Sequence, residues 1–397
     1  MIRFTTAGES HGQALVAIVE GIPAGLPLLA EHVDGELARR QQGYGRGRRM
    51  AIETDRAWLL AGVRAGETLG SPIAMLIPNK DWKNWEEIMD PAPRAGDTEQ
   101  GRKRQVTRVR PGHADLTGVL KYDRADARDI LERASARETT ARVAAGAICK
   151  QLLAAVGVRI GSHLVELGGI NASRPDVLPQ HLNEVADRSP LRTLDSAAEA
   201  SMLAMIDAAK ADGNTLGGVC EVVVEDLPVG LGSHVSWDRR LDGRLGAAML
   251  SIPAVKGVEI GLGFEAARRR GADVHDEIEA APGLARAGNV RRKTNRAGGL
   301  EGGMTTGEPL VVRVAMKPIS TLMRPLTTVD TKTGLSAEAT AERSDVTAVP
   351  AMGVIAEAMA ALVLADLLVE KFGGDSLAEL RRNHDAYLSH IASRIGG

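Results

Sequence analysis

Two histidines stand in short glycine-containing segments where an imidazole could transfer a proton. The segments read GESHG at residues 8–12 and RVRPGHAD at residues 108–115. Glycine lets the backbone approach a ligand closely, and histidine changes its charge near neutral pH. We therefore interpret Ser10, His11 and His113 as candidates for ligand binding and acid–base chemistry. A turn that holds a hydrogen-bonded structural histidine is the alternative for both segments.

Arginines cluster near these histidines. The segment GYGRGRR at residues 43–49 contains Arg46 and follows Arg40, while RASARET at 133–139 places Arg133 and Arg137 one helical turn apart. Arginine forms paired hydrogen bonds with carboxylates and phosphates. The chain as a whole has a net charge of −2. Local positive charge in such a chain indicates a small anionic ligand rather than a nucleic acid, although pairing with neighbouring glutamates is the ordinary alternative.

Three further segments near the C-terminus combine glycine, hydroxyl and charged side chains. They are AGGLEGGM at 297–304, KPIST at 317–321 and RSDV at 343–346. The lysine and hydroxyls of KPIST suit a phosphate, and Asp345 is a poised carboxylate or a helix cap. The sequence has no dinucleotide fingerprint, no Walker A motif, no zinc-ligand spacing and no nucleophile elbow.

The elements that must position these residues include a repeated unit. Residues 14–26 read ALVAIVEGIPAGL and residues 219–231 read VCEVVVEDLPVGL, and each is followed by Asp-Gly-x-Leu. This pattern predicts a strand, a turn and a helix twice, hence two pseudo-equivalent halves.

We also predict long helices at 126–156 and 350–371, a mobile surface loop at 84–105 and a peripheral polar tail at 374–397. Strands and helices interleave without the rhythm of a doubly wound parallel sheet. The fold class is therefore α/β (α+β), a layered sandwich of largely antiparallel sheets covered by helices, and we expect residues 1–397 to form a single domain.

Composition excludes several classes of protein. Aromatic residues make up only 3% and the isoelectric point is about 6.5, which disfavours an RNA-binding module. Cys149 and Cys220 lie in apolar stretches and are interpreted as buried free thiols. The N-terminus has no signal-peptide pattern, and we interpret residues 349–368 as a buried helix rather than a membrane span. These features predict a soluble cytoplasmic protein.

Taken in order, these segments resemble the chorismate synthase family, chiefly its bacterial, monofunctional members. The matching blocks are GESHG, GYGRG, RPGHAD, SARET, TLGG, AGGLEGGM, KPIST and RSDVTAVPA, which span residues 7 to about 353. The resemblance implies that reduced FMN assists an anti-1,4-elimination of phosphate from 5-enolpyruvylshikimate 3-phosphate. It also implies the family fold and an internal pseudo-symmetry.

The resemblance assigns roles to residues as follows. His11 would protonate or stabilise the departing phosphate, His113 would keep the reduced flavin in its reactive protonation state, and Asp345 would help the flavin N5 to accept the C6 proton. Residues implied in binding the substrate, or NADPH as an external reductant, are Ser10, Arg40, Arg46, Arg110 and Arg137. Residues implied in FMN contacts are Arg133, Ala134, Ser135, Pro253, Ala254, Gly302, Lys317, Pro318, Ile319, Ser320, Thr321 and Arg343. Pro253 and Ala134 replace polar residues that are frequent in the family.

The resemblance further implies a homotetramer that receives reduced FMN from an external flavin reductase, with no nucleic-acid or membrane partner. The nearest alternative is an NAD(P)H-linked flavin reductase or oxidoreductase. That alternative predicts a recognisable dinucleotide site, which the sequence lacks.

Overall fold

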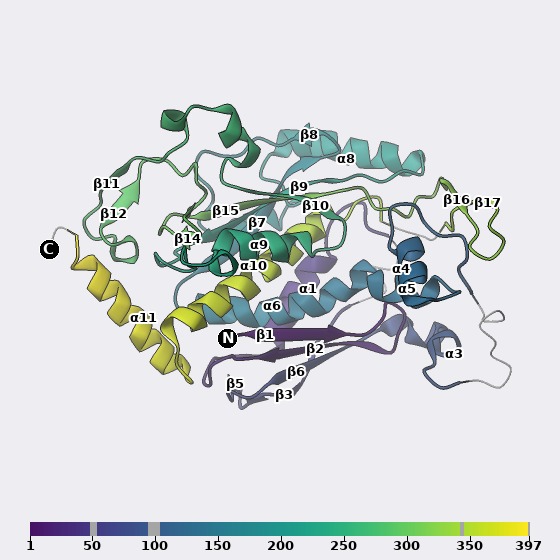
Figure 1. Cartoon of the computed structure of the whole chain (residues 1–397), viewed down its shortest axis with the longest axis horizontal. Coiled ribbons are helices and arrows are strands. Elements are labelled where there is room, and N and C mark those ends of the chain that lie inside the picture. The colour runs from purple at the N-terminus through teal and green to yellow at the C-terminus, as the bar shows by residue number, and fades with distance from the viewer. Residues whose placement is uncertain (48–53, 94–103, 342–344, 396–397) are drawn as a thin grey trace.

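The computed structural model describes residues 1–47, 54–93, 104–341 and 345–395. Two antiparallel sheets lie on either side of a layer of long helices (Figure 1). The first sheet has the strand order β1-β2-β6-β3, formed by β1 (Arg3–Ala7), β2 (Ala14–Glu20), β6 (Ile73–Pro78) and β3 (Trp58–Ala61). The second has the order β10-β15-β9-β7-β8, formed by β10 (Val255–Ile260), β15 (Leu310–Met316), β9 (Gly218–Glu225), β7 (Arg159–Leu167) and β8 (Ile170–Asn171).

Alternation of side chains fixes which face of the first sheet is inside. In β2 the buried positions are Leu15, Ala17 and Val19, and in β6 they are Ile73, Met75 and Ile77. Because successive side chains of a strand point to opposite faces, these two sets line one face of the sheet. The core therefore lies on that face, where the helices pack.

Two central helices fill the space between the sheets. Helix α6 (Thr139–Ala154) packs on β1 and β2, α10 (Val349–Phe372) packs on β7 and β9, and the two helices pack on each other. They approach so closely that a Cβ added to Gly146 would lie 2.4 Å from the Cβ of Ala358. Helices α1 (Ala30–Gln41) and α9 (Leu241–Leu250) flank this pair.

Smaller elements complete the described chain. The remaining longer helices are α4 (Asp115–Tyr122), α5 (Arg128–Ala134), α7 (Leu182–Ala186), α8 (Ser196–Ala211) and α11 (Leu377–Ala392), with a short helix α3 (Glu86–Met89). Four two-stranded ribbons are β4 (Val63–Arg64) with β5 (Glu67–Thr68), β11 (Ile278–Ala280) with β12 (Val290–Arg292), β13 (Leu300–Glu301) with β14 (Met304–Thr305), and β16 (Thr327–Val329) with β17 (Ser336–Glu338).

The predicted internal repeat is confirmed down to single hydrogen bonds. In the first half the Thr68 hydroxyl donates to Pro23 O at 2.6 Å and accepts from Leu26 N at 3.0 Å. In the second half the Thr305 hydroxyl donates to Pro228 O at 2.6 Å and accepts from Leu231 N at 2.8 Å. Each Pro-x-Gly-Leu turn is thus held by a threonine far along the chain. Strands β2 and β9 lead through these turns to helices α1 and α9.

The single helix predicted at 126–156 is wrong. It is interrupted at Ser135, whose backbone is extended (φ −64°, ψ 144°), between α5 and the 3-10 turn η2 (Ala136–Glu138) that precedes α6. The Ser135 hydroxyl accepts from Arg137 N at 3.3 Å, so the serine caps the next turn instead of continuing the helix. The break lies beside the candidate site.

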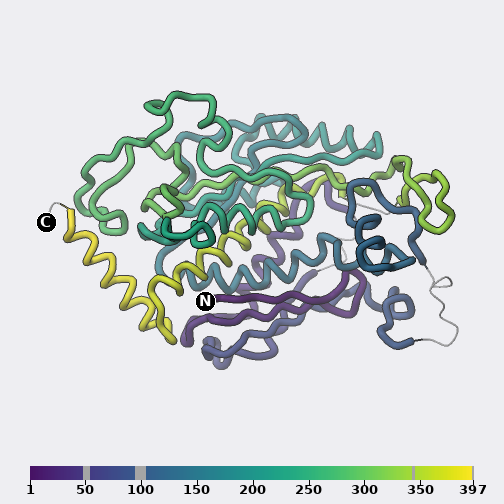
Figure 2. Tube along the Cα trace, viewed as in Figure 1, coloured from purple at the N-terminus to yellow at the C-terminus, as the bar shows by residue number. Residues whose placement is uncertain are grey.

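Two further predictions concern the C-terminal part of the chain. The helix predicted at 350–371 is confirmed as α10, which ends at Gly373 with φ 62°. It is the one helix among the described residues long and apolar enough to cross a membrane, but 89% of its apolar window is buried, so it is a core helix. The tail at 374–397 is peripheral but largely helical (α11), because Leu377 and Leu380 are buried against the core. Figure 2 shows it extending from the end of α10.

Both cysteines are free and buried, as predicted, and burial raises the pKa of each thiol to about 12. Part of the segment predicted as a mobile loop, residues 94–103, lies outside the described residues. Within 84–93 the chain forms α3.

The crossing of the two central helices generates a stability prediction. We expect Gly146→Ala to lower the free energy of unfolding by about 1–3 kcal/mol, because the added methyl group overlaps Ala358. The matched control is Gly246→Ala in α9, where nothing lies within 4 Å of the added Cβ. That change should raise the free energy of unfolding by about 0.5–1 kcal/mol. Urea denaturation measures both, and equal effects of the two changes would contradict the prediction.

Candidate active site

The candidate site lies where loops from both sheets meet the first turns of α6 and α10. The segment that follows β6 holds the GESHG loop in place: the Asn79 side-chain amide donates to Gly12 O at 2.7 Å and to Glu9 O at 3.2 Å. The segment that follows β15 contacts the other histidine loop, since the Lys317 ammonium group donates to Gly112 O at 2.5 Å. Equivalent ends of the two sheets therefore support one histidine each.

His11 is held by a carboxylate. Its Nδ1 lies 2.9 Å from Glu132 of α5, and its backbone N–H donates to the same carboxylate at 2.9 Å. Arg128 donates to Glu132 at 2.9 Å. Burial alone would raise the pKa of the Glu132 carboxyl, but its bonds with His11 and the charge of Arg128 outweigh burial and lower it. With Nδ1 turned to the carboxylate, Nε2 is the ring nitrogen placed for proton transfer.

An indole ring covers one face of this imidazole. The Trp85 ring stacks on His11 with 3.8 Å between ring centroids and 23° between planes. Trp85 lies between the 3-10 turn η1 (Lys80–Asn84) and α3, and it is half-buried. Neither Trp85 nor Glu132 was among the sequence-predicted site residues.

His113 has the same kind of support. Its Nδ1 bonds to Asp115, the first residue of α4, and Asp115 also accepts from the Arg110 guanidinium at 2.8 Å. Burial would raise the pKa of the Asp115 carboxyl, but the bonds from His113 and Arg110 hold it well below its usual range. Arg110 reaches onward to the Thr321 hydroxyl at 3.0 Å. The RPGHAD and KPIST segments thus lie together in the structure.

Three arginines, Arg40, Arg46 and Arg137, lie together beside the His11 loop, and we call this group the arginine pocket. Arg137 bonds both oxygens of Asp55 at 2.7 Å and the Asn79 side chain at 2.9 Å. Arg40 donates to the Thr139 hydroxyl at 3.0 Å and to the carbonyl of Ala136 at 2.9 Å. Asp55 and Asn79, which order this pocket, carry no sequence signal of their own.

Positive charge exceeds negative charge in this arginine pocket. Burial, together with the neighbouring charges of Arg46 and Arg137, lowers the pKa of Arg40 to about 9 and outweighs the opposing effect of Asp55. Among the described residues, Arg40 Nη1 and Arg46 Nε are buried without a hydrogen-bond partner. Since buried polar groups normally find partners, these atoms fit a bound anion.

Asp345 belongs to the same pocket, and its carboxylate bonds to Arg46 and Gly47 rather than to the first turn of a helix. It pairs with Arg46 at 3.1 Å and accepts from Gly47 N at 2.6 Å. The residue that caps α10 is Ala348, so the capping alternative for Asp345 is wrong. Arg343 lies outside the described residues.

The residues expected to contact FMN divide into two groups. Ser135 lies 3.2 Å from Ser10 through their hydroxyls, and Lys317 N donates to Ala254 O at 2.9 Å, which connects the Pro253-Ala254 turn to KPIST. The Arg133 guanidinium instead donates to backbone carbonyls at the end of β1, including Gly8 O at 3.0 Å. The Arg133 side chain therefore supports the loop in this structure.

Within one chain, Gly302 does not lie with the Pro253-Ala254 turn and the KPIST segment. Its ribbon packs at the start of α9, where Gly303 O accepts from Leu241 N at 2.9 Å, whereas Pro253 and Ala254 follow the end of that helix. A ten-residue helix is about 15 Å long, so the two segments lie near opposite ends of α9. The sequence motif alone could not reveal this separation.

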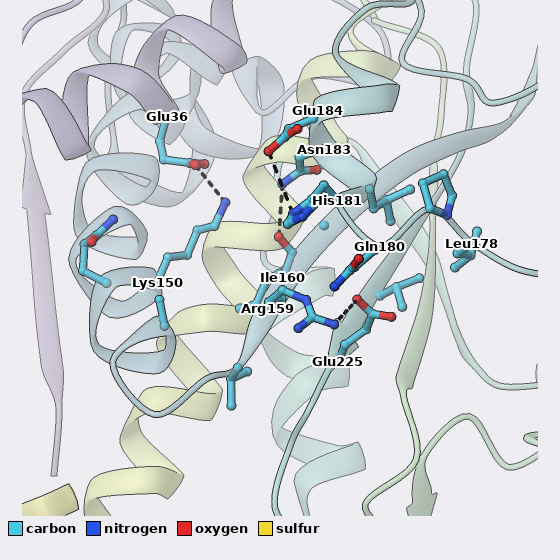
Figure 3. Close-up of a pocket in the computed structure, with 17 residues that line it drawn as sticks. Glu36, Lys150, Arg159, Ile160, Leu178, Gln180, His181, Asn183, Glu184 and Glu225 are labelled. Carbon is cyan, nitrogen blue, oxygen red and sulfur yellow. Dashed lines mark hydrogen bonds and ion pairs between the residues drawn. The ribbon is translucent and has the colours of Figure 1, made fainter.

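A separate pocket lies away from these residues. It is formed by α6, β7 and the segment around α7 and has a volume of about 270 Å³ (Figure 3). Lys150 and Glu36 pair there at 2.9 Å, and Arg159 pairs with Glu225 at 3.2 Å. None of the predicted site residues lines it, and its main charges are already paired.

Comparison with known proteins bears on this site. A family model described as "Chorismate synthase" matches residues 2–369. A protein of Symbiobacterium thermophilum named "Chorismate synthase" is 58% identical over 395 residues, which cover 99% of this chain and 100% of that protein. One of Geobacter metallireducens with the same name is 56% identical over 396 residues, with 99% and 100% covered. A solved structure described as "Crystal Structure of Chorismate Synthase" aligns with a TM-score of 0.79 and 44% identity, covering 99% of this chain and 98% of that one.

The charge excess of the arginine pocket generates a binding prediction. Inorganic phosphate at a hundred times its dissociation constant should raise the free energy of unfolding by about 2.7 kcal/mol. Arg40→Gln should remove most of this effect, because it deletes the buried cation. Arg324→Gln, which changes an arginine whose side chain is 80% exposed, should retain it. Thermal unfolding in phosphate and chloride buffers of equal ionic strength measures the effect, and equal phosphate responses in both variants would contradict the assignment.

Proposed function

Because this chain belongs to the chorismate synthase family, we propose that it is the lyase that converts 5-enolpyruvylshikimate 3-phosphate into chorismate with the help of reduced FMN. The observation that carries the proposal is the arginine pocket of Arg40, Arg46 and Arg137 beside His11, which Glu132 supports. The substrate has one phosphate and two carboxylates, so it needs several fixed cations. The flavin-reductase alternative is not favoured.

His11 acts on the phosphate. Glu132 holds its Nδ1, which directs Nε2 toward the leaving group at the arginine pocket. A proton delivered there stabilises the charge that develops on phosphate as the C3–O bond breaks. The hydroxyls of Ser10 and Ser135, 3.2 Å apart, add donors beside the same position.

The second histidine acts on the flavin side. The segment from Lys317 to Thr321, with the Pro253-Ala254 turn, offers a cation, hydroxyls and backbone groups that fit FMN. When bound, reduced FMN supplies electron density to the allylic system of the substrate and recovers it, without net oxidation. His113, held by Asp115, keeps the reduced cofactor in its reactive protonation state. Asp345, which Arg46 holds at the edge of the arginine pocket, would help N5 of bound FMN to take up the C6 proton.

Some assignments extend beyond the elimination itself. NADPH, as an external reductant, would meet the same Arg40 and Arg46 that serve the substrate. A separate flavin reductase would supply reduced FMN. The enzyme would work in the cytoplasm, where NADPH and FMN both occur. Gly302 would contact FMN only from another subunit, because of its place at the far end of α9.

Assembly into a homotetramer accords with the outer face of the first sheet. On that face Trp58 pairs with Leu76, which pairs with Val16, and Ala74 pairs with Ile18. Trp58 is 58% exposed and Leu60 59%, and no described helix packs on this side (Figure 1). An uncovered apolar face of this kind is typical of a subunit interface.

The central test is an anaerobic assay of phosphate release and chorismate formation from 5-enolpyruvylshikimate 3-phosphate. We expect both products only with reduced FMN, and no turnover by folded protein would refute the function. His11→Ala and His113→Ala should each lower kcat by about 10²–10⁴-fold, the usual value of a general acid or base. His390→Ala, which changes an exposed histidine of α11, is the matched control and should leave kcat unchanged.

The interface assignment has its own prediction. Trp58→Asp should reduce the assembly to smaller species, because it places a charge within the uncovered apolar face. Trp237→Asp, at a tryptophan that is 84% exposed, should leave the tetramer intact. Light scattering coupled to gel filtration measures the mass, and a tetrameric Trp58→Asp variant would move the interface to another surface.

A further inference from the structure

We propose that Trp85 is a positioning residue for His11, and that it fixes the plane of the imidazole while Glu132 fixes its Nδ1 end. This inference rests on the proposed function, in which His11 delivers a proton. It adds a residue that neither its sequence context nor a motif suggested.

Several bonds anchor Trp85. Its indole N–H donates to Asp81 Oδ2 at 2.9 Å, and its backbone N–H donates to Trp82 O at 2.8 Å, which closes the turn η1. Asn79, directly before this turn, is fixed by the GESHG loop and by Arg137. The indole is therefore tied by a short, hydrogen-bonded segment to the loop that carries His11.

Two guanidinium groups add to the packing. Arg104 lies 4.3 Å and Arg128 5.0 Å from the indole ring centroid. Arg128 also donates to Glu132 at 2.9 Å and to Arg104 O at 2.8 Å. One arginine thus links the residue that holds the end of the imidazole with the residue that covers its face.

The two supports restrict different motions. A hydrogen bond at Nδ1 still allows the imidazole to tilt about that bond, and such a tilt displaces Nε2, the atom that transfers the proton. Stacking at 3.8 Å opposes the tilt and also keeps water off that face of the ring. Because small errors of placement reduce proton transfer strongly, the stack should act on kcat rather than on substrate affinity.

The kinetic test compares two substitutions at one position. We expect Trp85→Ala to lower kcat by about 10²-fold with KM nearly unchanged, the loss typical of a 1 Å misplacement. Trp85→Phe retains a stacking ring and should stay within a few-fold of wild type. Trp82→Phe, in the same turn, is the matched control and should not change kcat. A wild-type kcat for Trp85→Ala, or a change confined to KM, would overturn the proposal.

A second measurement does not depend on turnover. In crystal structures of the ligand-free protein, His11 should occupy one ring orientation in the wild type and in Trp85→Phe, and several in Trp85→Ala. A single ordered orientation in Trp85→Ala would overturn the positioning role. If the wild type released no phosphate, the proposed function would fail, while this structural comparison would still decide what Trp85 does to His11.

Discussion

The site depends on holding several guanidinium groups together away from solvent before their anion arrives. Arg40 is 4% exposed and Arg137 7% exposed, and within the described part of the chain Asp55 and Asp345 are the carboxylates that pair with these two arginines and Arg46. Such an arrangement costs free energy in the empty protein, since burial lowers the pKa of Arg40 to about 9. The arrangement persists because neutral acceptors on rigid elements, such as Ala136 O and the Thr139 hydroxyl, accept hydrogen bonds from Arg40. An arriving polyanion then completes a charge arrangement that already exists.

The internal repeat explains how one chain surrounds a ligand from two sides. Strand β6 lies between β2 and β3, and β15 lies between β9 and β10, so the two strands occupy equivalent places in their sheets. The segment after β6 orders the His11 loop and the segment after β15 contacts the His113 loop. Each half therefore provides one histidine-supporting segment, and each histidine has its own carboxylate. The site is a product of the duplication rather than an insertion into one half.

The sequence could predict features that depend on local pattern. The repeated Pro-x-Gly-Leu turns and the helix α10 were both accessible from it. It could not identify Glu132 or Asp55, because these carboxylates lie 121 and 82 residues from His11 and Arg137, respectively. Trp85 was hidden for the same reason, inside a polar segment that suggested only a loop. The case of Gly302 is different. Its motif was visible in the sequence, but its distance from the turn at Ala254 results from the packing of its ribbon against α9.

The break at Ser135 is the point where a core helix becomes part of a site. A continuous helix over 126–156 would satisfy the carbonyl of Ala136 internally and would turn the Ser135 hydroxyl to its own backbone. Because Ser135 is extended, its hydroxyl instead lies 3.2 Å from Ser10, and Ala136 O is available to Arg40. The helix that resumes at Thr139 then crosses α10 at Gly146 and Ala358, which fixes the distance between the two halves. Helix propensity, which favours continuation through this alanine-rich stretch, is overridden here by hydrogen bonds to residues from the rest of the chain. The seven residues from Arg133 to Thr139 thereby serve the loop beneath His11 and the arginine pocket, and they lead into the helix that makes the central crossing.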